Sequence, residues 1–288
     1  MALEKWGDLM IQWFPGHMAK ARNEIEEKLK LVDIVFELVD ARVPLSSRNP
    51  MIREIIKNKP RLVLMTKATK ADSNYTKKWQ EFLLNEGTMS MVIDSVSGLG
   101  INRIVNYAKE VLKDKFEKEQ AKGMKERPIR AMVIGIPNVG KSTLINKLVN
   151  RKVTTVGDRP GVTKAQQWIR INKDLNLIDT PGVLWPKFDD EITGYNLAMT
   201  GAIKDQIMHK DDLIIYFLDF LKKFYPHALN RYNVDVTVDN LDILNKIAGD
   251  RGYFQGKYYD YEKVYEAILN DYRSDRLGKI TLDRLENV

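Results

Sequence analysis

The chain has 288 residues, of which 44% are hydrophobic and 30% are charged, a composition typical of a soluble globular protein with one large or two modest domains. It shows no apolar run of about eighteen residues and no targeting pattern, so we expect a cytoplasmic protein that does not enter a membrane. The absence of cysteine excludes disulfides, thiol catalysis and cysteine-ligated zinc. The formal net charge of +7 suits a polyanionic partner, although a mildly basic surface also serves solubility.

Six short apolar runs are expected to form the strands of a mainly parallel sheet, because both faces of such strands are covered. These runs are residues 33–40, 61–65, 90–94, 129–136, 166–171 and 175–179. Residues 143–149 have the spacing of an amphipathic helix, and the other intervals are long enough for helices. The sequence therefore predicts an α/β fold of about six strands with helices on both faces.

The pattern of charge and hydrophobicity changes twice further along the chain. Residues 109–128 are rich in Lys, Arg and Glu, and we interpret them as a solvated helical face. Beyond residue 187 the apolar residues take helical spacing. The helical runs are residues 211–225, 241–249 and 261–278. We therefore expect an α/β domain over residues 1–187 and a mainly helical C-terminal domain over residues 188–288.

The most specific motif is GIPNVGKS at residues 135–142, which satisfies the phosphate-loop pattern G-x-x-x-x-G-K-S/T. It follows an apolar strand and opens a helix, where backbone N–H groups can converge on phosphate oxygens. Lys141 is expected to neutralise the β- and γ-phosphates and the Ser142 hydroxyl to coordinate Mg²⁺. The expected nucleotide contacts of this segment are Asn138, Val139, Gly140, Lys141, Ser142 and Thr143. A plain strand-to-helix turn is the alternative interpretation.

A second segment suited to sensing phosphate follows the loop. The motif DTPG at residues 179–182 closes an apolar strand, so Asp179 can hold Mg²⁺ through water and the Gly182 amide can reach the γ-phosphate. Thr163 lies between the two motifs and is a candidate to complete the Mg²⁺ shell, although a loop threonine is often structural. Together these residues predict a magnesium-dependent nucleotide site.

These motifs resemble those of translation-factor GTPases, and GIPNVGKST with DTPG is similar to the bacterial ribosome biogenesis GTPase A (YlqF-type) family of circularly permuted GTPases. The resemblance extends across nearly the whole chain and includes WFPGHMAKA, ELVDARVPLSSRNP, SVSGLG, DTPGVLWPKF and TGAIKD. Ordinary GTPases place their guanine-reading motifs after DxxG, whereas RLVLMTKATKAD and SVSG precede the phosphate loop here. The resemblance implies a permuted GTPase domain, in which residues 109–128 join the ancestral last helix to the ancestral first strand.

The guanine-reading segment departs from the family pattern NKxD, which falls on Thr66, Lys67, Ala68 and Thr69. An aspartate at the last position would accept two hydrogen bonds from guanine, and the Thr69 hydroxyl recovers only part of that interaction. An aspartate in place of Thr69 is therefore expected to strengthen guanine selectivity. A shifted TKAD ending at Asp72 stays open as an alternative, although we prefer the unshifted register. Asp94 and Ser95 match the family's last base-contacting loop, whose backbone amides reach guanine O6.

The position directly after DxxG carries Val183 instead of a glutamine that could orient the attacking water. The resemblance implies membership of GTPases in which another group or the ribosome completes the site. His17 in PGHMAKA is the family's candidate to position the water, while a structural histidine is the alternative. Asn138 matches an asparagine that helps related GTPases bind K⁺, so potassium dependence is a further expectation.

The function that the resemblance implies is maturation of the large (50S) ribosomal subunit. GTP-bound protein would dock on a precursor particle, with rRNA and ribosomal proteins as partners, and ribosome-stimulated hydrolysis would release it. We expect a monomer that hydrolyses GTP slowly by itself. Two other classes stay open: a general P-loop ATPase or nucleotide kinase, and an RNA-binding module that nucleotide merely stabilises. Thr69 and Val183 motivate the last of these.

Overall fold

A mainly parallel sheet forms the centre of the first part of the chain in the computed structural model, which describes residues 15–149, 168–180, 190–204 and 208–287. Six strands lie in the order β3-β2-β1-β4-β6-β5, and only β5 runs antiparallel to its neighbour. The strands are β1 (Ile34–Asp40), β2 (Arg61–Thr66), β3 (Met89–Val92), β4 (Ile129–Gly135), β5 (Trp168–Arg170) and β6 (Leu175–Asp179). The predicted α/β class and its mainly parallel strands are therefore confirmed.

Helices cover both faces of this sheet because successive residues of each buried strand point to opposite sides. Ile34, Phe36 and Leu38 of β1 belong to one buried cluster, together with residues of α4 and α6. Val35 packs on the opposite face with α1 and α2, and Val39 packs there with α3. These helices are α1 (Pro15–Leu29), α2 (Pro50–Ile56), α3 (Ser73–Asn85), α4 (Ile104–Val111) and α6 (Lys141–Val149).

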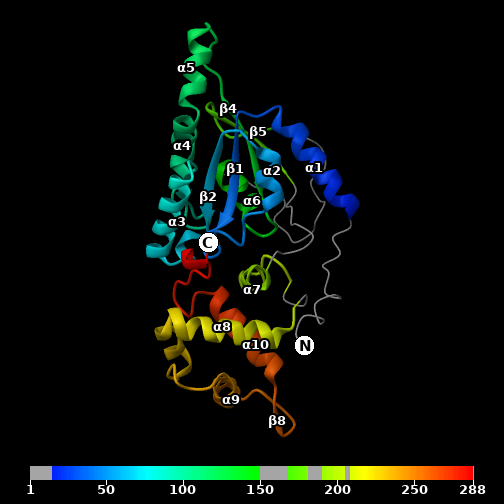
Figure 1. Cartoon of the computed structure of the whole chain (residues 1–288), viewed down its shortest axis with the longest axis vertical. Coiled ribbons are helices and arrows are strands. Elements are labelled where there is room, and N and C mark those ends of the chain that lie inside the picture. Colours follow the sequence, from blue (N-terminus) through cyan, green and yellow to red (C-terminus); the bar gives the residue numbers. More distant parts are fainter. Residues whose placement is uncertain (1–14, 150–167, 181–189, 205–207, 288) are drawn as a thin grey trace.

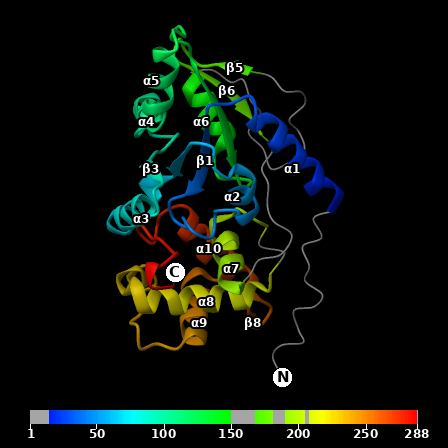
Figure 2. The same cartoon turned by 45° about the horizontal axis from the view of Figure 1, so that its top comes forward.

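The charged segment forms a helical arm at one end of the sheet (Figures 1 and 2). Helix α5 (Lys113–Ala121) follows α4 and has no buried residue, as expected for a solvated face. Lys115 and Arg127 from this segment both bind the buried carboxylate of Asp33 just before β1. The arm lies at the opposite end of the sheet from the C-terminal helices.

Helices dominate the described part of the chain beyond residue 190, as the spacing of apolar residues predicts. They are α7 (Glu191–Thr200), α8 (Lys210–Phe224), α9 (Asn240–Arg251) and α10 (Tyr261–Arg273), with the 3-10 segments η4 (Pro226–Tyr232) and η5 (Leu285–Asn287). A short hairpin, β7 (Phe254–Gln255) with β8 (Tyr258–Tyr259), separates α9 from α10. Helix starts here are encoded locally, because Asp190, Asp239 and Asp260 each accept a hydrogen bond from a first-turn amide.

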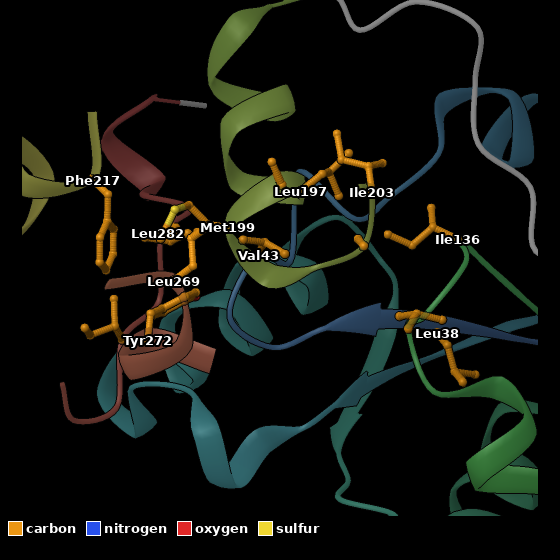
Figure 3. Packing of buried hydrophobic residues seen from close by; sticks show 14 of the residues in the cluster. Leu38, Val43, Ile136, Leu197, Met199, Ile203, Phe217, Leu269, Tyr272 and Leu282 are labelled. Atoms are coloured by element: carbon orange, nitrogen blue, oxygen red, sulfur yellow. The ribbon is translucent and has the colours of Figure 1, made fainter. Parts of the chain in front are cut away.

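The C-terminal helices pack against the edge of the sheet where the parallel strands end (Figure 1). One buried cluster runs from Leu38 of β1 and from Ile136, just after β4, through Leu197 and Ile203 into the C-terminal helices (Figure 3). Asp283 near the C-terminus strengthens this contact, since its carboxylate accepts hydrogen bonds from the amides of Leu45 and Ser46, at 2.6 and 2.7 Å. The carboxyl edge of the sheet is therefore held against the helical part by apolar packing and by buried hydrogen bonds.

Within the described ranges, no helix combines the length and the apolar character needed to cross a membrane.

Candidate nucleotide-binding site

The phosphate loop joins β4 to α6 at the carboxyl edge of the sheet. Asn138 has φ 57° and Gly140 has φ 108°, so the loop turns through two residues of left-handed or otherwise unusual backbone. Gly135 is needed for another reason, because an added Cβ would lie 2.8 Å from the Leu38 carbonyl oxygen of β1. The loop therefore sits tightly on the neighbouring strand while its amides remain at the start of α6.

Lys141 is held inside the loop that it follows. Its ammonium donates to the carbonyl oxygens of Gly135 and Ile136, at 3.0 and 2.8 Å. An ammonium has three N–H donors, so one remains for a further acceptor. Burial lowers the pKa of Lys141 to about 8, with the charge of Asp179 acting in the opposite direction. A phosphate would supply the counter-charge that this buried cation lacks among the loop carbonyls.

Asp179 ends β6, beside the phosphate loop. Burial raises the pKa of its carboxyl group, while Lys141, the Thr180 amide and Lys28 act to lower it. The Thr180 amide donates to the carboxylate at 2.9 Å, and the Thr180 hydroxyl donates to Val133 of β4 at 2.7 Å. This strand end therefore presents a half-buried carboxylate whose position is set by its neighbour's two hydrogen bonds.

Lys28 of α1 contacts the end of β6, which the sequence alone does not indicate. Its buried ammonium donates to the backbone oxygen of Asp179 at 3.0 Å and to Glu24 at 2.6 Å. Helix α1 is thereby bound to the strand that leads into DTPG. A lysine on an otherwise amphipathic helix carries no local signal of such a distant partner.

Thr66 and Lys67 contact the phosphate loop from the end of β2. The buried Thr66 hydroxyl lies 2.8 Å from the Val139 carbonyl oxygen and 3.0 Å from that of Val39. Lys67 adopts a left-handed conformation, and its ammonium donates to the Asn138 carbonyl oxygen at 2.9 Å. Two segments that are far apart in the sequence therefore meet at one edge of the sheet.

Ala68 begins the 3-10 segment η1 (Ala68–Lys70), and its amide donates to Ile93 at 3.2 Å, just before the loop that carries Asp94 and Ser95. The Thr69 hydroxyl lies 2.6 Å from Asp94 Oδ2. Asp72, the end of the shifted motif, instead caps α3 by accepting from the amides of Asn74 and Tyr75.

A buried charge cluster connects this edge to the C-terminal helices. Asp40 at the end of β1 binds Arg42 at 2.7 Å and Lys67 at 2.9 Å. Burial raises the pKa of Asp40, but Arg42 and Lys67 outweigh that effect and hold the pKa well below its usual range. Arg42 also donates to the Thr200 carbonyl oxygen at 3.3 Å, and the Asn138 side chain donates to that of Gly201 at 3.2 Å. The end of α7 thus contacts both the charge cluster and the phosphate loop.

The substitution Asp40→Asn is expected to lower the free energy of unfolding by about 3–5 kcal/mol, because it leaves the buried guanidinium of Arg42 without its counter-charge. Urea denaturation followed by circular dichroism measures the change. Glu26→Gln is the matched control at the exposed Arg22–Glu26 pair, where a loss below about 1 kcal/mol is expected. Equal losses in the two variants would contradict the role given to the cluster.

The remaining predicted residues fall in different places. Gly140, Lys141, Ser142 and Thr143 lie at the junction of the loop with α6, where Ser142 and Thr143 are half-buried. Thr163, Gly182 and Val183 lie outside the described residues. His17 belongs to the first turn of α1.

The phosphate loop, the carboxylate at the end of β6 and the threonine-lysine segment at the end of β2 together define a P-loop GTPase in which the β2 segment precedes the phosphate loop in the chain. Residues 130–246 match the family described as 50S ribosome-binding GTPase. The chain is 51% identical to ribosome biogenesis GTPase A of Bacillus pumilus, over 97% of this chain and 100% of that protein. It is 34% identical to the probable ribosome biogenesis GTPase A of Mycoplasma pneumoniae, over 95% and 96%.

The fold is also that of a solved structure, the GNP-bound YlqF from T. maritima, with a TM-score of 0.66 and 21% identity over 92% of this chain and 98% of that chain. The chain belongs to the ribosome biogenesis GTPase A family, and it is a GTPase.

Proposed function

We propose that this GTPase acts in late assembly of the large ribosomal subunit, where the GTP-bound protein docks on a precursor particle and ribosome-stimulated hydrolysis releases it. The observation that carries this proposal is the direct contact between the phosphate loop and the helical part, through Asn138 and the carbonyl oxygen of Gly201 at 3.2 Å. A change at the loop on hydrolysis would act on the end of α7 without an intermediate element.

The proposed nucleotide contacts follow the geometry of the carboxyl edge. The phosphates would lie on the amides of the loop and on Lys141, and the base would lie beside Thr66–Thr69 and the loop of Asp94 and Ser95. The proposed phosphate-side contacts are Asn138, Val139, Gly140, Lys141, Ser142, Thr143 and Gly182. The hydroxyl of Ser142 and the carboxylate of Asp179 are hard oxygen donors of the kind that Mg²⁺ prefers, and Thr163 would complete the set. Bound Mg²⁺ would neutralise charge on the phosphates.

Two further roles belong to this proposal. His17 would position the attacking water, because the side chain of Val183 cannot accept or donate a hydrogen bond. Asn138 would hold K⁺ through its side-chain oxygen while its nitrogen donates to Gly201.

The helical part, residues 188–288, is proposed to contact rRNA, and residues 1–187 to form the GTPase domain. The β7–β8 hairpin supports the proposed contact with rRNA, because it exposes aromatic rings next to a lysine. Tyr258 is 80% exposed and Phe254 is 49% exposed, and Lys257 lies between them in sequence. Exposed aromatic rings beside a cation suit stacking on unpaired bases and attraction to their phosphates. The protein would work as a cytoplasmic monomer.

The substitution Tyr258→Ala is expected to weaken binding to large-subunit precursors by about tenfold, the usual loss when one base loses its stacking partner. GTP affinity should stay unchanged, because the hairpin is far from the phosphate loop in Figure 1. Leu84→Ala on α3, outside the helical part and at a side chain that is 63% exposed, is the control for loss of exposed apolar surface and should bind precursors like the parent protein. Undiminished binding of the Tyr258 variant would remove the hairpin from the interface.

Co-sedimentation with purified large-subunit precursors tests the proposed cycle. The protein should sediment with precursors in the presence of a non-hydrolysable GTP analogue and remain unbound with GDP. Equal association in both nucleotide states would contradict the proposed cycle. It would favour the alternative that Thr69 and Val183 motivate, an RNA-binding module that nucleotide merely stabilises.

A further inference from the structure

Thr69 occupies the position where the guanine-reading aspartate is expected, and it contacts a carboxylate from another loop. Its hydroxyl oxygen lies 2.6 Å from Asp94 Oδ2. Thr69 is exposed at the carboxyl edge, whereas Asp94 is buried behind it with only 4% of its surface accessible. A base placed at this edge would therefore meet Thr69 before Asp94.

The hydrogen-bond pattern decides which way the hydroxyl points. Asp94 Oδ1 accepts from the amides of Val96 and Ser97, at 2.9 and 2.8 Å. Burial acts to raise the pKa of Asp94, but the hydrogen bonds from Thr69, Ser97 and Val96 outweigh that effect and lower the pKa below its usual value. The carboxyl group is therefore an anion at neutral pH. An ionised carboxylate has no proton to donate, so the proton in the Thr69–Asp94 contact comes from Thr69.

We propose that Thr69 and Asp94 act as a pair that selects guanine, with Asp94 turning the Thr69 hydroxyl into an acceptor. The one hydroxyl proton is used on Asp94, and only lone pairs face outward. Guanine presents N–H donors on the edge that the family aspartate reads, whereas adenine presents the N1 lone pair there. The inference rests on the proposed placement of the base beside Thr66–Thr69.

The adjacent loop supports the same choice of base. Within the described chain the amides of Asp94, Val96, Ser97 and Gly98 all have acceptors, whereas the amide of the half-buried Ser95 has none. A free donor at this position suits the O6 oxygen of guanine and opposes the amino group of adenine. Acceptor and donor thus lie on neighbouring loops in the arrangement that guanine requires.

The direction of the Thr69–Asp94 hydrogen bond leads us to expect an unusual result for Asp94→Asn. The amides of Val96 and Ser97 would keep the oxygen of the new side chain, so its NH₂ group would face Thr69. The threonine would then accept from this NH₂ group and direct its own proton outward, toward the base. This variant should therefore bind adenine nucleotides better, relative to guanine nucleotides, than the parent protein does. The shift should be larger than in Thr69→Val, which only removes the hydroxyl.

Equilibrium titrations with GDP and ADP test the pair in the full chain. Thr69→Val is expected to lower the ratio of GDP to ADP affinity by about tenfold, and Asp94→Asn to lower it further, while Thr69→Ser keeps it within about threefold. Thr69→Asp alone would place two carboxylates side by side, so the gain in selectivity expected from the sequence should appear only in Thr69→Asp with Asp94→Asn.

Two outcomes separate this inference from the proposed function. If Lys141→Ala does not weaken nucleotide binding, the nucleotide site itself is misplaced. If binding depends on Lys141 but Thr69→Val and Asp94→Asn retain the parental affinity ratio, only the selecting pair is overturned. Thermal melting of each variant checks its folding, and the exposed position of Thr69 makes Thr69→Val the safer of the two single substitutions.

Discussion

Lys141→Ala is expected to weaken the binding of GTP and GDP by about 10–10²-fold, because the one charge-assisted hydrogen bond left for phosphate is worth about 1.5–3 kcal/mol. The position of the Lys141 ammonium is closely fixed by its surroundings. It is buried, its ammonium is oriented by the carbonyl oxygens of Gly135 and Ile136, and its remaining N–H points to the phosphate side of the loop in our proposal. Isothermal titration measures the loss.

Two controls separate phosphate binding from folding. Lys141→Met keeps the apolar stem of the buried side chain and should lose affinity to the same extent, whereas Lys118→Ala on the exposed α5 should lose none. Unchanged affinity in Lys141→Met would contradict the phosphate-loop assignment.

His17→Ala should cut kcat for GTP hydrolysis by about 10²-fold or more and leave GTP affinity nearly intact, since a group that positions water acts mainly in the transition state. The residue lies in the first turn of α1, and Lys28 near the other end of this helix binds the backbone oxygen of Asp179. The helix that carries His17 is thus attached to the strand that leads into DTPG.

Single-turnover and steady-state hydrolysis with large-subunit precursors present measure the effect of His17→Ala. Arg22→Ala is the control on the same helix, because among the described residues Arg22 pairs only with the exposed Glu26. A variant that binds precursors normally and hydrolyses GTP at the parental stimulated rate would show that His17 is structural. Catalysis would then depend on K⁺, the substrate or rRNA.

Much of the fold follows from local sequence. The apolar runs became strands because both faces of β1, β2 and β4 are buried, and the residue limits differ from the predicted ones by at most a few residues. The phosphate loop was also predictable, because its pattern is tied to a strand-to-helix junction.

The contacts between distant segments could not be predicted in this way. Nothing near Asp40 in the sequence indicates that its carboxylate meets Lys67, and nothing near Thr69 indicates Asp94. Both contacts depend on parallel strands ending at one edge, so they follow from topology and not from composition. The packing of the helical part on that edge, through Asn138 and Gly201, has the same origin.

Multiple-turnover hydrolysis, measured with and without large-subunit precursors, tests the proposal that this chain couples GTP hydrolysis to the large ribosomal subunit. We expect slow hydrolysis by the protein alone, stimulation of at least about tenfold by precursors, and little competition from ATP. An unstimulated rate would contradict the proposed coupling to the ribosome, and equal hydrolysis of ATP would contradict the proposed selection of guanine.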